Sequence, residues 1–232
     1  MCGRFTLRTP SRDLVEIFQL LRSLDISPRY NIAPTQPVLA IRQVGKFREP
    51  CLLKWGLIPS WAKDPRSGPP LINARAETLA AKPAFRSAFG KRRCLIPADG
   101  FYEWKKGEGK TRQAFYIRML KDRPFAFAGL WESWKGGESS TIESCTIITT
   151  TANSRLAELH ERMPVLLHEE DYDRWLNPTL DDPALLQGLL VPYPAEEMTF
   201  YPVSPFVNSP RNDGPICVEA WPAENGTGQT NQ

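Results

Sequence analysis

Short runs of β-branched and aromatic residues, separated by turns that contain Gly, Pro or Asp, dominate the pattern of apolar and polar positions along the chain. Runs of this kind are typical of strands. They predict strands at Val38–Val44, Cys51–Trp55, Arg93–Ile96, Phe101–Lys105, Ala114–Met119, Phe125–Trp131, Cys145–Thr150 and Met198–Val203.

A helical pattern precedes these runs, over Pro10–Leu24. Its apolar residues recur at spacings of three and four, which indicates one buried helix face: Leu14, Ile17, Phe18 and Leu21. Further helices are predicted at Ser154–His160, Glu169–Leu176 and Pro183–Leu189. Many strands with few helices between them favour an α+β fold with a largely antiparallel, barrel-like β core and flanking helices.

The composition adds that the chain can form a substantial core. It has 232 residues, of which 41% are hydrophobic and 24% charged, as in an ordinary globular protein. We expect one domain over residues 2–221 and a disordered tail at 222–232, which holds a single charge. No apolar run reaches the roughly 18–20 residues of a membrane span, and no signal peptide pattern is present. We therefore expect a cytoplasmic protein without a membrane partner.

The five cysteines are far apart in the sequence, no Cys-x-x-Cys occurs, and there are two histidines. A zinc site needs clustered ligands and a disulfide scaffold needs closely spaced cysteines. We therefore expect no metal, no cofactor and no disulfide framework. Cys51 and Cys145 lie in apolar surroundings, which predicts buried, reduced thiols.

The net charge of +3 conceals an uneven distribution. Residues 1–53 carry a net +4, residues 54–123 a net +10 and residues 124–232 a net −11. Such asymmetry suggests one strongly positive face and a polyanionic partner. The alternative is that the halves neutralise each other in the folded protein.

Cys2 is the position with the most informative chemistry. Met1 is readily removed before a small residue, so we expect the mature chain to begin with a cysteine that has a free α-amine beside its thiol. Both groups are partly nucleophilic near neutral pH. Such an aminothiol condenses with an aldehyde, because the amine forms an imine and the thiol then closes a five-membered thiazolidine.

Six motifs give Cys2 a context. They are MCGRF (1–5), RYNIAPTQ (29–36), WGLIPSW (55–61), NARAET (73–78), RCLIPADGFYEW (93–104) and HERMPV (160–165). Together they closely resemble the SRAP (SOS response-associated peptidase) family, whose members process abasic sites in DNA. The resemblance runs from residue 2 to about residue 210.

The resemblance implies a DNA-repair enzyme that senses abasic sites in single-stranded DNA. Cys2 would capture the aldehyde of the ring-opened abasic sugar as a stable thiazolidine DNA–protein crosslink. The intermediate imine acidifies neighbouring hydrogens, so strand scission by β-elimination would compete when ring closure is impaired. The family name records a proposed self-cleavage that removes Met1. We expect a monomer, associated with the nucleoid if the source is bacterial.

The resemblance also assigns three residues to the acid–base chemistry. Asn73 would position Cys2 or the sugar, Glu103 would move protons during imine formation and ring closure, and His160 would assist opening of the sugar. Glu and His commonly carry such transfers. Each has a plainer interpretation: Asn73 as a local turn residue, Glu103 as a solvent-facing strand residue, and His160 as a residue at the negative end of a helix.

For DNA contact, the resemblance assigns phosphates to four arginines: Arg4, Arg75, Arg86 and Arg162. It places Trp61 and Trp104 near the bases or the sugar. Arginines neutralise phosphate, and aromatic rings stack on unpaired bases whatever the sequence. Most of the seven tryptophans are expected in the core instead. The basic stretch Lys105–Arg123 matches no motif, and its role stays open.

Two other function classes remain open. A thiol peptidase would use Cys2 as nucleophile with His160 or Glu103 as base, but no peptide-specificity pocket is recognisable. A non-catalytic module that binds single-stranded DNA would account for the charge asymmetry alone. An aldehyde-specific covalent adduct would separate the abasic-site enzyme from both.

Overall fold

The computed structural model describes residues 2–106, 112–136 and 140–222. Met1 and all of the predicted tail beyond residue 222 lie outside these residues, so the proposed end of the domain at residue 221 stays a prediction. Among the helices of the described ranges, none combines the length and the apolar character that a membrane crossing requires.

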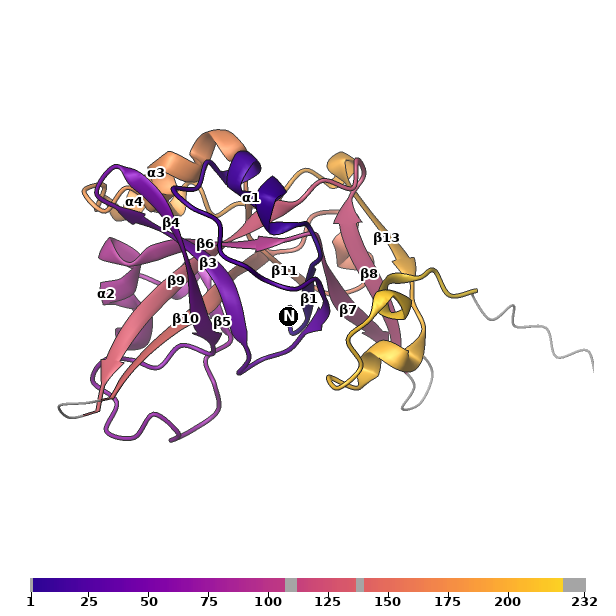
Figure 1. The fold of residues 1–232 in the computed structure, drawn as a ribbon, viewed down its shortest axis with the longest axis horizontal. Helices are drawn as coiled ribbons and strands as arrows, with labels where there is room; N and C mark the ends of the chain where they lie inside the picture. The colour runs from indigo at the N-terminus through magenta and orange to yellow at the C-terminus, as the bar shows by residue number, and fades with distance from the viewer. Residues whose placement is uncertain (1, 107–111, 137–139, 223–232) are drawn as a thin grey trace, which may run out of the picture.

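Five strands close into a barrel (Figure 1), because β9 pairs with β10 and β10 pairs with β4. The strands are β3 (Pro37–Val44), β4 (Phe47–Trp55), β6 (Arg93–Ala98), β9 (Phe125–Lys135) and β10 (Thr141–Thr151). The β10–β4 pairing is parallel and the other pairings of the ring are antiparallel. The predicted α+β fold with a largely antiparallel, barrel-like core is confirmed.

Three short strands extend the barrel wall: β5 (Asn73–Arg75), β11 (Arg162–Pro164) and β12 (Leu166–Leu167). Both β5 and β11 pair with the second half of β10, where Thr149 lies opposite Arg75 on one side and Pro164 on the other. These strands were not predicted from the sequence, since two or three residues show no periodicity.

A second, fully antiparallel sheet lies beside the barrel (Figure 1) in the order β13-β8-β7-β1-β2. Its strands are β1 (Phe5–Leu7), β2 (Arg29–Ile32), β7 (Gly100–Lys106), β8 (Arg112–Met119) and β13 (Met198–Pro202). The N-terminal strand β1 is thus held between neighbours from distant parts of the chain. The N-terminus emerges between this sheet and the barrel.

The helices are few and short: α1 (Ser11–Phe18), α2 (Pro83–Lys91), α3 (Tyr172–Leu176) and α4 (Pro183–Gln187). The predicted helix Pro10–Leu24 is too long, because Gln19 adopts a left-handed conformation with φ 53° and ends α1. The predicted helix Ser154–His160 is wrong, since only a 3-10 turn forms there, η2 (Leu156–Glu158). Other 3-10 turns are η1 (Ala76–Thr78), η3 (Glu169–Asp171), η4 (Ala195–Glu197), η5 (Pro205–Asn208) and η6 (Pro215–Val218).

Apolar side chains form two clusters. The larger fills the barrel and continues to β1, and the smaller joins β7 and β8 to the segment that carries η5 and η6. All five cysteines are free thiols. Cys145 is buried as predicted, whereas Cys51 is only half-buried. Apolar packing therefore holds the segment with η5 and η6 against the same five-stranded sheet that contains the N-terminal strand β1.

Candidate active site at the N-terminal segment

The segment Cys2–Arg4 runs between the barrel and the five-stranded sheet. On the barrel side, the Asn73 Nδ2 donates to the carbonyl oxygen of Cys2 over 2.9 Å. On the sheet side, the backbone N–H of Tyr102 donates to the carbonyl oxygen of Arg4 over 3.0 Å. Cys2 itself is fully buried. The first residues of the chain are thus fixed from both sides.

Glu103 lies in β7, two residues after the core residue Phe101 and on the same face of the strand. It is 6% exposed, so the interpretation as a solvent-facing residue is wrong. The pKa of the Cys2 thiol is raised far above its ordinary value, first by burial and then by the negative charge of Glu103. The carboxylate and the thiol are therefore electrostatic neighbours, as an acid–base pair requires.

Asn73 is the first residue of β5, opposite Ile147 of β10. Its side chain bonds to Cys2, 71 positions away, so the interpretation as a local turn residue is wrong. The Asn73 Oδ1 is buried and meets no donor among the described residues. This oxygen is an acceptor that the N-terminal amine or a bound sugar could use.

His160 follows η2 and precedes β11, next to the half of β10 that pairs with β5. The Nδ1 accepts the backbone N–H of Arg162 over 3.0 Å, which leaves Nε2 as the atom available to a substrate. His160 follows a three-residue 3-10 turn and its N–H donates to the carbonyl oxygen of Leu156, so the interpretation as a residue at the end of a short helix stays open. Across the described part of the chain, no hydrogen bond joins His160 to Cys2.

Of the four arginines predicted to contact phosphate, two are exposed and two donate hydrogen bonds to protein groups. Arg75 and Arg86 are exposed. Arg162 instead donates to both carboxylate oxygens of Glu77, over 2.8 and 3.1 Å, and to the carbonyl oxygen of Thr149. Arg4 is half-buried, and its guanidinium donates to protein acceptors, described below. Glu77 was within a quoted motif, but nothing in the sequence marked it as the partner of Arg162.

The two predicted DNA-contacting tryptophans differ in exposure. Trp61 is 67% exposed, whereas Trp104 is half-buried and its indole Nε1 donates to the Asn208 Oδ1 over 2.8 Å. The expectation that most of the seven tryptophans are in the core is wrong, because only Trp55, Trp134 and Trp175 are buried. Trp61 therefore has the exposed ring that stacking on a base needs.

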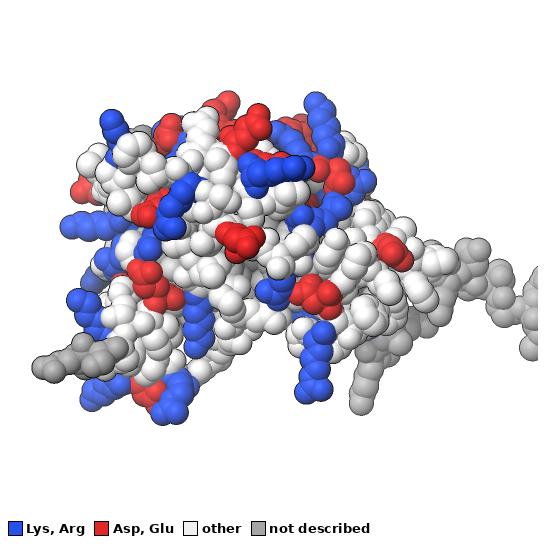
Figure 2. All heavy atoms as spheres, viewed as in Figure 1, with Lys and Arg blue, Asp and Glu red and all other residues white. Residues whose placement is uncertain are grey.

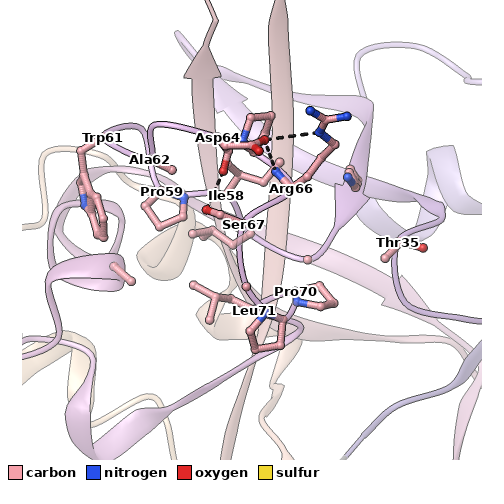
Figure 3. Close-up of a pocket in the computed structure, with 17 residues that line it drawn as sticks. Thr35, Ile58, Pro59, Trp61, Ala62, Asp64, Arg66, Ser67, Pro70 and Leu71 are labelled. Carbon is pink, nitrogen blue, oxygen red and sulfur yellow. Dashed lines mark hydrogen bonds and ion pairs between the residues drawn. The ribbon is translucent and has the colours of Figure 1, made fainter.

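Trp61 borders a pocket of about 410 Å³ formed mainly by residues 56–71. In Figure 3 the indole lies on one side and the bonded Asp64 and Arg66 on another, with Leu71 and Pro70 below. The pocket wall continues directly into β5, since Leu71 is two residues from Asn73. This pocket was not predicted from the sequence, because its proline- and glycine-containing loop resembles an ordinary connection.

Charge on the face drawn in Figure 2 is mixed, with basic and acidic side chains interspersed. The single strongly positive face suggested by the sequence is not visible in this view. Within the described residues, no three His, Cys, Asp or Glu side chains are grouped as a metal site.

Comparison with known proteins gives consistent results. The family model "SOS response associated peptidase (SRAP)" matches residues 1–210. "Abasic site processing protein YoqW" of Bacillus subtilis (strain 168) is 47% identical over 223 residues, which is 95% of this chain and 100% of that protein. "Abasic site processing protein HMCES" of Mus musculus is 32% identical, covering 76% of this chain and 60% of that protein. A crystal structure of a Bacteroides thetaiotaomicron protein superposes with a TM-score of 0.84 at 26% identity, covering 95% of this chain and 100% of that one.

Proposed function

Because this chain belongs to the SOS response-associated peptidase (SRAP) family, we propose that it processes abasic sites in single-stranded DNA. The proposed chemistry is covalent capture of the sugar aldehyde by Cys2 after removal of Met1. The observation that carries this proposal is the burial of Cys2 beside Glu103, with its carbonyl oxygen bonded to Asn73.

The capture has two bond-forming steps. The α-amine of Cys2 adds to C1′ of the open sugar, and loss of one water gives an imine. The thiol sulfur then adds to the same carbon while its proton is transferred to the imine nitrogen. The product is a thiazolidine whose mass is that of protein plus DNA minus one water.

Glu103 is proposed to move these protons. Burial and the carboxylate keep the pKa of the Cys2 thiol high, so the thiol is protonated at neutral pH and the amine attacks first. The carboxylate of Glu103 then accepts the thiol proton as sulfur attacks, and returns it to nitrogen. This order avoids a free thiolate, which would be poorly stabilised in a buried site.

Asn73 is proposed to position Cys2, and His160 is proposed to assist opening of the sugar ring. The Asn73 amide holds the Cys2 carbonyl oxygen with Nδ2 and offers Oδ1 as an acceptor to the amine. With Nδ1 of His160 occupied by the Arg162 N–H, Nε2 is the atom that would exchange a proton with the sugar O4′ during ring opening. Imine formation needs this open form.

We propose phosphate contacts at the exposed Arg75 and Arg86, and base stacking at Trp61. The polar groups of Arg4, Arg162 and Trp104 already bond to protein atoms. Their contacts with DNA are therefore left as predictions from the sequence. Phosphate contacts release counterions, so affinity for single-stranded DNA should fall as salt rises. One copy of the chain carries all the proposed groups, and we propose that it acts as a monomer.

The test is an intact mass before and after incubation with single-stranded DNA that carries one abasic site. We expect loss of Met1 and then a heat-stable adduct of protein plus DNA minus water. Loss of Met1 without an adduct would favour a peptidase or a passive binder. Retention of Met1 would exclude the aminothiol mechanism.

A further inference from the structure

The segment 205–218, here called the C-terminal clasp, contains η5 and η6 and packs on β2 and β8. Its buried residues Val207 and Cys217 belong to the smaller apolar cluster, with Tyr102 of β7. The family match ends at residue 210, inside this segment. The family match therefore assigns no role to the clasp as a whole.

Asn31 of β2 joins the clasp to the N-terminal segment. Its side chain is fully buried. The amide Nδ2 donates to the carbonyl oxygens of Val207, Ser209 and Asn212, over 3.1, 3.0 and 2.7 Å. Its Oδ1 accepts from the Arg4 guanidinium over 2.9 Å. One amide group thus fixes three clasp carbonyls and Arg4 at the same time.

Arg4 also donates directly to the clasp, to the carbonyl oxygens of Val207 over 3.0 Å and Asn208 over 3.3 Å. Its own carbonyl oxygen lies 3.8 Å from the Cys2 sulfur. The position of the Arg4 side chain is therefore set by groups about 200 residues away in the sequence. Arg4 is two residues from Cys2, so these contacts hold the segment that leads to the reactive end of the chain.

The clasp reaches the other side of the site as well. The Asn208 Oδ1 accepts from the indole of Trp104 over 2.8 Å, and Trp104 is the neighbour of Glu103 in β7. Asp213 accepts the backbone N–H groups of Tyr30 and Asn31, over 2.6 and 3.1 Å, and so fixes β2 to the clasp. The strand that carries the acid–base group and the segment that carries the nucleophile are both held by this one element.

We infer that Asn31 is a positioning residue, which acts through Arg4 and the C-terminal clasp to hold Cys2 in register with Glu103. This inference rests on the proposed function. Ring closure requires the sulfur, the imine carbon and the carboxylate to meet within a narrow geometry, and small misplacements cost large factors in rate. Asn31 itself is buried and does not meet the substrate.

The test separates positioning from binding. Asn31→Leu removes the amide with little change of volume and no change of charge. We expect the maximum rate of adduct formation at saturating abasic DNA to fall at least tenfold, while the half-saturating DNA concentration stays within twofold of wild type. Arg211→Ala, an exposed residue of the same clasp, is the matched control and should keep both values.

A milder variant covers the case in which Asn31→Leu does not fold. Asn208→Ala removes only the contact to Trp104, and we expect a smaller fall of the maximum rate in the same direction. Arg4→Met adds a second readout. A positioning role leaves the salt dependence of DNA binding unchanged, whereas a lost phosphate contact reduces its logarithmic slope by about 0.7.

Two results would overturn the inference while leaving the proposed function intact. One is a wild-type maximum rate in folded Asn31→Leu. The other is a raised half-saturating concentration with an unchanged maximum rate, which would make Asn31 a determinant of binding. If the wild-type protein forms no adduct at all, the proposed function itself fails and the inference fails with it.

Discussion

At the scale of single residues, burial and one neighbouring carboxylate set the protonation of Cys2. Both raise the pKa of its thiol, and a protonated thiol becomes a nucleophile only when a base removes its proton. In the proposed mechanism the amine therefore acts first and the thiol closes the ring. The two functional groups of one residue have separable roles, which substitution can test.

Cys2→Ala keeps an N-terminal amine and removes the thiol. The amine still forms an imine, but without sulfur the imine hydrolyses or undergoes β-elimination. We expect the heat-stable adduct to fall by more than about a hundredfold on a denaturing gel, since the ring is its source of stability, while some strand scission remains. Cys51→Ala, at a half-buried thiol of the barrel, is the control. A heat-stable adduct of Cys2→Ala at wild-type yield contradicts the thiazolidine mechanism.

Glu77 occupies the guanidinium of Arg162, which was predicted to contact phosphate. Their two hydrogen bonds lower the pKa of Glu77, so this pair stabilises the fold above the ordinary pKa of the carboxyl group and the contribution is lost as pH falls through its lowered value. Because the Glu77 side chain is 47% exposed, we expect loss of this ion pair to lower the free energy of unfolding by less than about 1 kcal/mol.

Glu77→Gln should therefore raise affinity for intact single-stranded DNA two- to fivefold, because it releases the Arg162 guanidinium and removes a negative charge. Fluorescence anisotropy at fixed salt measures this. Glu161→Gln, which removes an exposed charge nearby, is the control for a general charge effect. An affinity equal to wild type would place Arg162 in the framework of the fold and not on the DNA.

The sequence identified the reacting residues better than their partners. Cys2, Asn73 and Glu103 lie in the quoted motifs, and the structure brings them together. The pairing of Arg162 with Glu77 and of Arg4 with Asn31 could not be predicted, because a single charged or amide residue has many candidate partners until the fold places one beside it.

At the scale of elements, long strands were predictable and short ones were not. The barrel strands β3, β9 and β10 have eight or more residues and were expected close to their observed positions. The site depends instead on β1 and β5, three residues each, which are too short for a pattern. Helix α2 was missed although its buried residues Phe85, Ala88 and Phe89 recur at helical spacing.

Arg93, at the start of β6, caps the C-terminal ends of two helices. It is 3% exposed, and burial lowers its pKa to about 10. Its guanidinium donates to carbonyl oxygens at the ends of α2 and α3 and of the following turn: Phe89, Gly90, Trp175, Asn177 and Leu180. These are orphan carbonyls that a helix end must satisfy.

Arg93→Met should destabilise the protein by about 3 to 5 kcal/mol, because it leaves several buried carbonyl oxygens without a donor. Urea unfolding followed by circular dichroism measures the loss. Lys91→Met, at the exposed end of α2, should change stability by less than about 0.5 kcal/mol. Equal stability of both variants would mean that water replaces the guanidinium, and that Arg93 does not hold α2 and α3 together.

At the scale of the whole molecule, the candidate site joins three distant parts of the chain: Cys2, Asn73 and Glu103. The barrel contributes Asn73 beside β10, and the five-stranded sheet contributes Glu103 and the strand that follows Cys2. The site lies where these two bodies meet. Any process that loosens the global fold should therefore also loosen the site.

Alkaline pH is such a process. The pKa values of all five cysteines are raised by burial, and so are those of Tyr102, Tyr116 and Tyr172. In the unfolded chain these groups ionise at their ordinary pKa values, whereas in the folded chain they stay neutral. Their contribution to stability is thus complete below the ordinary thiol pKa and is lost as pH rises through the ordinary values toward the raised ones.

We expect the free energy of unfolding to decline steeply from about pH 8.5 upward, with each fully buried thiol adding a slope of up to about 1.4 kcal/mol per pH unit. Urea unfolding at pH 7, 8, 9 and 10 measures this decline. Cys145→Ala, which removes one fully buried thiol, should be less stable at pH 7 but lose stability less steeply. The difference in slope is independent of the cavity that the substitution leaves, because a cavity cost does not titrate. A urea midpoint at pH 10 equal to that at pH 7 would show that these groups ionise in the folded protein as easily as in the unfolded chain, and would contradict the raised pKa values.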